Sequence, residues 1–140
     1  MDWVQWQQLA KRWLIDAKTM LDNHRWSAAY YLAGYAVECG LKACVLVRIV
    51  AEPEVIFEIK KFSENCWTHN LLDLVKLAGL EPIRVADIAA NRALHKNRQA
   101  VKDWNERVRF QTASHHKAKQ LYRAITDNTN GVMQWIRVHW

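Results

Sequence analysis

The sequence predicts an all-α protein, an antiparallel four-helix-type bundle with one or two additional short helices. Three observations favour this class. Only four glycines and two prolines occur in 140 residues, and these two residue types interrupt helices. Apolar residues recur at gaps of three and four, which places them on one face of a helix. No segment alternates strictly between apolar and polar residues, so a β-sheet is not expected.

A chain of 140 residues has the size of one ordinary domain, and we expect a single domain over residues 1–140. Hydrophobic residues make up 51% of it, and eight tryptophans supply much of the apolar surface that a core requires. We expect the tryptophans in the core, with Trp140 as the exposed exception. The formal net charge of +6 suits an anionic partner, but it is also common on an ordinary protein surface.

Two long helices are expected first. An apolar stripe predicts a helix over residues 3–21, and the turn-like residues Asp22-Asn23-His24 end it. The next helix, over residues 26–50, is apolar nearly all round. A helix of that kind lies at the centre of a bundle, where other helices cover it on every side.

Shorter elements are expected in the middle of the chain. Pro53 fits the first turn of a short helix that runs through about Phe62, and residues 63–65 are typical of a loop. Thr68 is expected to cap the next helix, and Gly79 to end it.

Two more helices are expected in the last part of the chain. After Pro82 a helix is expected to reach residue 101 or 102. The connection over residues 104–110 is expected to pack through Trp104, Val108 and Phe110. The last helix extends to Ile136, and because its apolar spacing stays in register across residues 128–131, we expect a kink or a continuous helix there.

The three cysteines indicate reduced thiols and therefore a cytoplasmic protein, because they are odd in number and form no CxxC pair. Cys39 and Cys44 fall on the apolar helix and are expected in the core. Cys66-x-x-His69 lacks a second pair of ligands at zinc spacing, so no metal site is predicted. No cofactor motif occurs, and neither a signal peptide nor an apolar run long enough for a membrane span is seen.

One stretch, residues 25–43 (RWSAAYYLAGYAVECGLKA), resembles the second helix of the HEPN family (higher eukaryotes and prokaryotes nucleotide-binding domain). Two later pieces agree with that family in order and spacing: Thr68–Leu74 before a short helix, and Trp104–Phe110 before the last one. The resemblance covers nearly the whole chain. The motif of the second helix is fairly specific, and the two later pieces are useful only together with it.

The resemblance implies an antiparallel helical bundle that often forms a homodimer. Bacterial and archaeal members are commonly paired with a small nucleotidyltransferase. Many are metal-independent ribonucleases that act as toxins in toxin–antitoxin or defence pairs, whereas others bind a nucleotide or a partner protein without cutting. No cofactor is implied.

Catalytic candidates come from the ribonuclease subset, which carries an Arg followed after four to six residues by a His at the start of the last helix. Here Arg109 is followed by His115 after five residues and by His116 after six. Such a short pattern often arises by chance, so its position before the last helix carries the argument. An Arg can hold a phosphate bidentately, and a His can move the proton of a ribose hydroxyl. Phe110 departs from the polar residue that often follows the Arg.

Basic residues surround this pair. Arg107, Lys117, Lys119 and Arg123 occur with no acid between Glu106 and Asp127, and Thr112 or Ser114 could cap the helix. This pattern predicts a binding site for phosphate or RNA. An ordinary solvated basic face, with His115 and His116 in its first turn, is the alternative.

A polar line interrupts the apolar second helix. Tyr31, Tyr35, Glu38 and Lys42 are spaced by four, three and four residues, and Glu38 and Lys42 are in the favourable order for a helical ion pair. They predict a buried polar network that lines a pocket facing the last helix, and His69 could join it. Structural support is the favoured role, because buried charges usually need partners merely to be tolerated.

Three functional hypotheses result. The first is a metal-independent ribonuclease whose composite site uses Arg109 and His115 from two protomers. The second is a non-catalytic module that binds a nucleotide or docks a nucleotidyltransferase, and Phe110 favours it. The third is a structural bundle whose basic end is only surface.

Overall fold

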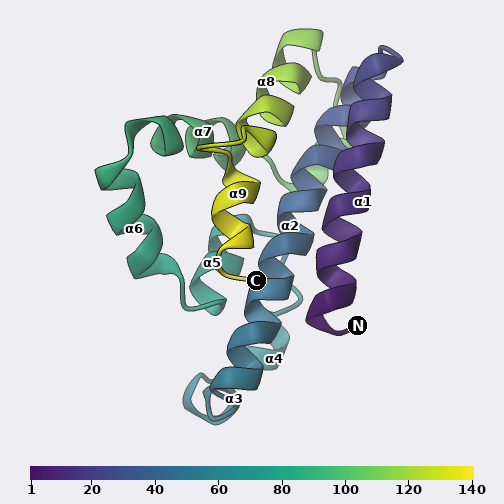
Figure 1. Cartoon of the computed structure of the whole chain (residues 1–140). Coiled ribbons are helices and arrows are strands. Elements are labelled where there is room, and N and C mark those ends of the chain that lie inside the picture. Colours follow the sequence, from purple (N-terminus) through teal and green to yellow (C-terminus); the bar gives the residue numbers. More distant parts are fainter.

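The computed structural model describes all 140 residues and contains nine α-helices, one 3-10 helix and no strand, which confirms the all-α class (Figure 1). The helices are α1 (Trp3–Asp22), α2 (Trp26–Ala51), α3 (Val55–Glu58), α4 (Phe62–Asn65), α5 (Leu71–Leu77), α6 (Glu81–Ala90), α7 (Arg92–Lys102), α8 (His115–Thr126) and α9 (Val132–Arg137), and η1 (Glu106–Phe110) is the 3-10 helix. None of these helices has the length and apolar character needed to cross a membrane.

Helix α2 is the central element, as its apolar sequence predicts. Helix α1 lies antiparallel along it, and α5, α8, α9 and η1 contact its other faces (Figure 1). Asp2 starts α1 with a capping box, since its carboxylate accepts from the backbone N–H of Gln5 and the Gln5 side chain accepts from that of Asp2. The two long helices begin and end within two residues of the predicted positions.

Small residues on α2 let its neighbours approach closely. A Cβ atom added to Gly34 would lie 2.2 Å from the indole ring of Trp104, so this indole occupies the space that any larger side chain would need. A Cβ at Gly40 would lie 3.0 Å from Ile136 on α9. The glycines of α2 therefore admit Trp104 and α9 to the core at a modest cost in helix propensity.

The prediction of one short helix from Pro53 to Phe62 is wrong. The chain forms two single-turn helices instead, and the predicted loop at residues 63–65 belongs to α4. The break falls at Lys61, which has a left-handed backbone with φ of 61°. Val55 and Phe62 are both buried, so the chain has to turn between them to place both side chains in the core.

Helix α5 begins two residues later than predicted. Asn70, rather than Thr68, is the N-cap, because its side chain accepts from the backbone N–H of Asp73. The Thr68 hydroxyl accepts from the N–H of Asn70 instead. Gly79 ends the helix as predicted, with φ of 73°.

Two predicted helices are interrupted at corners that bind each other: the helix after Pro82, and the last helix, for which a kink or a continuous helix was predicted. The first corner is Asn91, whose side chain caps α7 by accepting from the N–H of Leu94. The second is residues 127–131, which separate α8 from α9. The Asn91 amide donates to the side-chain oxygen of Asn130 at 2.8 Å, and the Asn97 amide donates to its backbone oxygen at 2.9 Å. These long-range hydrogen bonds override the helical register that the apolar spacing predicts.

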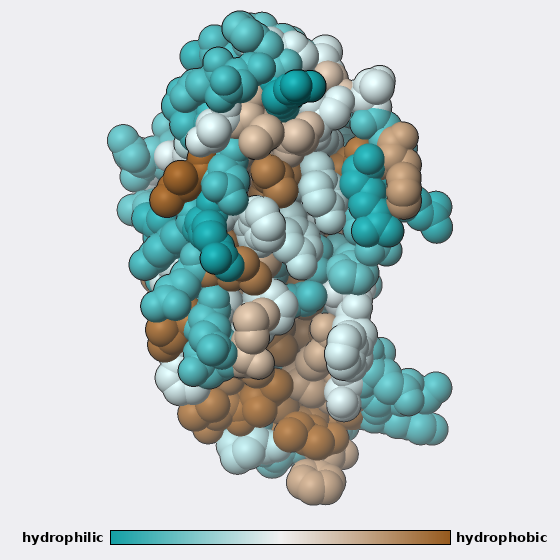
Figure 2. All heavy atoms as spheres, turned by 90° about the vertical axis from the view of Figure 1, so that its right-hand side faces the viewer, coloured by the Kyte–Doolittle hydropathy of each residue, from teal (hydrophilic) through white to brown (hydrophobic).

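Two predictions about exposed aromatic residues are wrong. Phe110 is 78% exposed and does not pack into the core, although Trp104 and Val108 are buried as predicted. Trp67 is the exposed tryptophan, at 81%, whereas Trp140 is half-buried next to Lys11 of α1. Figure 2 shows the side of the molecule on which α1 lies. Hydrophobic residues gather at the lower end of that side, where α1 starts and α2 ends.

Candidate functional site

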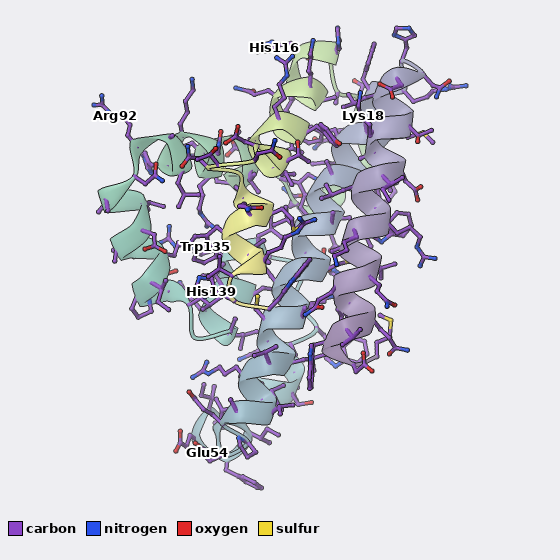
Figure 3. All side chains as sticks on the ribbon, in the orientation of Figure 1. Lys18, Glu54, Arg92, His116, Trp135 and His139 are labelled. Atoms are coloured by element: carbon purple, nitrogen blue, oxygen red, sulfur yellow. The ribbon has the colours of Figure 1, made fainter.

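The positive charge of the chain is concentrated on α7 and α8. These two helices hold seven of the 20 Lys and Arg residues and none of the 14 acidic residues, so the remainder has 13 cations against 14 acids. The excess behind the net charge of +6 therefore lies on two neighbouring helices that pack against each other. Figure 3 shows Arg92 and His116, at the starts of these helices, far from Glu54 at the opposite end of the molecule.

A groove of about 470 Å³ separates the exposed faces of α7 and α8. We name it the α7–α8 groove. Its cationic side chains are Lys96, Lys119 and Arg123, and His116 lies beside them. Asp127 is its single carboxylate. Alanines and amide side chains complete the lining: Ala93, Asn97, Ala100, Gln120, Ala124 and Asn130. An open, mostly cationic groove of this kind is suited to a polyanion.

Sequence patterns did not predict the α7 side of this groove. Lys96 was not a candidate, although one signal was present, because residues 92–102 contain no acid. Ala93, Lys96, Asn97 and Ala100 recur at gaps of three and four, which puts them on one face of α7. Two acid-free basic helices close together in a chain of this length predict a shared basic surface.

The two candidate histidines have different surroundings. His116 lines the α7–α8 groove. The ring of His115 instead stacks on Trp26 at the start of α2, with centroids 4.2 Å apart and 22° between the planes. Both residues are exposed. Stacking orients the His115 ring and leaves the residue accessible to a ligand.

Two hydrogen bonds hold the start of α8, one within the helix and one to α2. The hydroxyl of Ser114, one of the two predicted caps, accepts from the backbone N–H of Lys117. The N–H of Ala113 donates to the hydroxyl of Ser27 on α2 at 2.9 Å. The segment that carries His115 is therefore fixed to the beginning of α2.

Arg109 lies at the exposed end of η1. Its guanidinium is 4.7 Å from the ring of Phe110, the residue that departs from the family pattern. No hydrogen bond or ion pair joins Arg109 to His115. Arg107 is also exposed on η1, and the ammonium of Lys117 lies 5.1 Å from the ring of Tyr30. Of the predicted basic residues, only Lys119 and Arg123 line the groove with His116.

The predicted polar network forms around Glu38, which is 0% exposed. One carboxylate oxygen, Oε1, is 2.9 Å from Lys42 Nζ and 2.8 Å from His69 Nδ1. The other ring nitrogen of His69 is 3.3 Å from the carboxylate of Glu106 on η1. Each ring nitrogen of His69 therefore faces a carboxylate. His69 thus joins the centre of α2 to η1.

The direction of this network differs from the prediction. It faces η1 and the segment before α5 rather than the last helix, because its partners are His69 and Glu106. The two tyrosines take no part in its ion pairs. Tyr31 stacks on Tyr35 at 5.9 Å and on Trp104 at 6.1 Å, and so belongs to an aromatic cluster beside the network.

The thiols are not poised for chemistry. Burial raises the pKa of Cys39 and of Cys44 from 9.0 to about 12, and it also raises the pKa of Cys66. At neutral pH the reactive thiolate form is therefore suppressed at all three positions. No group of three or more His, Cys, Asp and Glu side chains is arranged to hold a metal ion.

Comparison with known proteins assigns no family to this chain. It matches no family model, no curated protein and no solved structure.

Proposed function

We propose that this chain is a HEPN-type protein that binds RNA along the α7–α8 groove. One observation carries the proposal: the two helices that form the groove hold the whole excess of positive charge and no acidic residue. Nucleic-acid binding draws most of its affinity from contacts between cations and phosphates. The resemblance of residues 25–43, 68–74 and 104–110 to HEPN proteins supports the same class of ligand.

The spacing along α8 supports a single-stranded ligand. His116, Lys119 and Arg123 are separated by three and four residues, so they lie on one face and span about 10 Å along the helix. Lys96 faces them from α7. A flexible strand can follow such a short cationic path, and the amide side chains of the groove offer hydrogen bonds to its sugars and bases.

Salt-dependent binding of a fluorescent single-stranded RNA tests the proposal. The double variant Lys119→Gln, Arg123→Gln is expected to bind at least tenfold more weakly, with a salt slope smaller by about 0.7 for each lost phosphate contact. The matched control is Lys11→Gln, Arg12→Gln on α1, which removes the same charge from another face. Equal weakening in both variants would leave only non-specific attraction to the net charge and would reject the groove.

Metal-independent cleavage of the bound RNA is a second candidate function. It is favoured by the position of His115. This residue is exposed, its ring is oriented by Trp26, and five residues separate it from Arg109 in the chain. In this reaction the ribose 2′-hydroxyl attacks the phosphorus and the bond to the 5′-oxygen breaks. The products are a 2′,3′-cyclic phosphate and a 5′-hydroxyl. A His moves the protons, and an Arg holds the phosphate oxygens.

A homodimer is part of this second candidate. Within one chain the Arg109 guanidinium packs on Phe110, whereas the His115 ring packs on Trp26. Arg109 and His115 therefore have different partners. A composite site would bring Arg109 of one protomer to His115 of its partner. The nucleotidyltransferase partner, which the HEPN resemblance implies, remains a prediction. The cytoplasmic location inferred from the cysteines is also a prediction.

Incubation of purified protein with mixed RNA in excess chelator tests cleavage. The expected result is cleavage by the wild type that is lost in Arg109→Ala and His115→Ala, with both variants shown to be folded and dimeric by light scattering. His116→Ala is the comparison, because His116 lies in the groove and is expected to affect binding more than cleavage. Intact RNA after incubation with the wild type rejects cleavage and leaves the binding proposal to the salt titration.

A further inference from the structure

A second cavity lies on the other side of α7. It has a volume of about 390 Å³ and is enclosed by residues of α2, α5, α6 and α7, together with Trp104 and Asn105. We name it the α5–α7 pocket. Its size falls within the range of pockets that hold small molecules. It shares no lining residue with the α7–α8 groove.

Arg98 is one of three Lys and Arg side chains that line this pocket, with Arg84 and Lys102. It is half-buried, and it forms none of the ion pairs or side-chain hydrogen bonds of the fold. Arg84, its neighbour in the pocket, differs in this respect, because its guanidinium donates to both carboxylate oxygens of Glu81 at 2.7 and 2.8 Å. The donors of Arg84 are therefore engaged, whereas those of Arg98 are free.

The environment of Arg98 is unfavourable to its charge. Burial, with a smaller contribution from the nearby Arg84, lowers the pKa of Arg98 from 12.5 to about 10, and Glu81 opposes this shift. One side of the guanidinium is covered by Trp135, whose ring centroid is 5.9 Å away. The half-buried guanidinium therefore has an aromatic neighbour but no hydrogen-bonded or ion-paired partner, and an anion that entered the pocket would supply one.

The rest of the pocket defines the ligand that would fit. Val37, Leu41 and Ile88 form an apolar wall. Lys102 and His95 lie on the same side of α7 as Arg98, and Asp73 is the single carboxylate among the lining residues. The arrangement combines an arginine fork, which suits a carboxylate or a phosphate, with a surface that can bury an apolar body.

We propose that the α5–α7 pocket binds a small organic anion, a carboxylate or phosphate carried on an apolar body, with Arg98 holding the charged group. This site is independent of the proposed RNA groove. His95, Arg98 and Lys102 recur at gaps of three and four on one face of α7, whereas Lys96 and Ala100 face α8. Variants on one face therefore leave the other face intact.

Titration of the whole chain with simple probes tests the proposal. The probes are phenyl phosphate, benzoate, inorganic phosphate and benzyl alcohol, with calorimetry and thermal unfolding as readouts. Saturable binding of phenyl phosphate or benzoate, with a rise in Tm, is expected. Inorganic phosphate lacks the apolar body and benzyl alcohol lacks the charge, so each is expected to bind at least tenfold more weakly. The stronger of the two aromatic anions identifies the charged group.

Arg98→Met is the decisive variant, and Lys96→Met on the opposite face is its control. Arg98→Met is expected to weaken binding of the aromatic anion at least tenfold, because a charge-assisted hydrogen bond is lost. Its Tm without ligand is expected to equal or exceed that of the wild type, since an unpaired buried charge is removed. Arg98→Lys keeps the charge but lacks the fork, and is expected to give an intermediate affinity.

The proposal is overturned by either of two outcomes. One is the absence of saturable binding of both aromatic anions by the wild type at about 10 mM, a concentration at which even a weak site of Kd near 1 mM is mostly occupied. The other is binding that is unchanged in folded Arg98→Met. In that second case, loss of binding in Lys96→Met would place the anion in the α7–α8 groove instead.

Discussion

The molecule holds two clusters of histidine and charged residues, and their surroundings are opposite. At the centre of α2, Glu38 is fully buried and its carboxylate contacts both Lys42 and His69. At the start of α8, His115 and His116 are exposed and form no ion pair. Burial of Glu38 requires its charge to be paired, which makes the first cluster part of the structure. Exposure leaves the second cluster available for a ligand.

This contrast also explains where the motif residues of the HEPN resemblance lie. The pieces at residues 25–43, 68–74 and 104–110 contribute Glu38, His69 and Glu106, which meet in one network. Motif residues therefore include a set that holds three segments of the chain together. Resemblance alone does not distinguish such residues from residues that touch a ligand.

The largest effect on the free energy of unfolding is expected in the buried cluster around Glu38. Glu38→Ala leaves Lys42 and His69 without their common anion and is expected to lower the free energy of unfolding by about 3 kcal/mol. Urea denaturation measures this change. Glu52→Ala at the C-cap of α2 is the matched control, because the Glu52 carboxylate is exposed and 3.5 Å from Arg48, and a loss below about 1 kcal/mol is expected there. Equal losses in the two variants would make the Glu38 network no more structural than a surface ion pair.

A smaller loss is expected where Trp104 meets α2. Gly34→Ala places a methyl group within 2.2 Å of the indole, which has to move, and we expect a loss of about 2 kcal/mol. Gly40→Ala is the control, since its methyl group would lie 3.0 Å from Ile136 and 3.4 Å from Met133, contacts that need a much smaller shift than the 2.2 Å overlap with Trp104. Thermal unfolding of both variants measures the difference. A Gly34→Ala variant as stable as Gly40→Ala would show that Trp104 adapts freely and does not position η1.

The comparison between the two histidine regions can be tested directly. His69→Ala removes a hydrogen bond to a buried carboxylate, and because His69 is itself partly exposed we expect a loss of about 1.5 kcal/mol. His116→Ala is expected to change stability by less than about 0.5 kcal/mol. Chemical denaturation of the pair distinguishes the roles. A larger loss in His116→Ala would reverse the assignment of structural and exposed regions.

The smallest effect at neutral pH is expected from the buried thiols. Their folded pKa of about 12 lies above the unfolded value of 9.0, so their contribution to stability is fully present below pH 9 and is lost as the pH rises through 12. Stability is therefore expected to decline between pH 9 and pH 12, and less so in a Cys39→Ala, Cys44→Ala variant. At pH 8, a thiol reagent is expected to label Cys66 first. Early labelling of Cys39 in the folded protein would contradict its burial.

Periodicity predicted the α1–α2 pair well because both helices depend on local patterns. The apolar stripe, the capping residue Asp2 and the turn after Asp22 all lie within a few residues of the elements they define. The predicted burial of Glu38 with Lys42 as partner also follows from a four-residue spacing on an apolar helix.

Long-range contacts account for the failures. The corners at Asn91 and at residues 127–131 depend on amide hydrogen bonds between positions more than 30 residues apart, which no local pattern reveals. The exposure of Phe110 and the partial burial of Arg98 likewise depend on which helices lie next to them. The α8 half of the basic groove was predicted from charge, whereas the α7 half required the two helices to be placed side by side.

The fit of Trp104 against Gly34 has a consequence for how this sequence can change over evolution. Each residue is acceptable because of the other, since a side chain at position 34 would occupy the space that the indole fills. Substitutions at these two positions are therefore expected to occur together among descendants of this chain: a larger residue at 34 with a smaller one at 104. Two positions 70 residues apart thus behave as one inherited character.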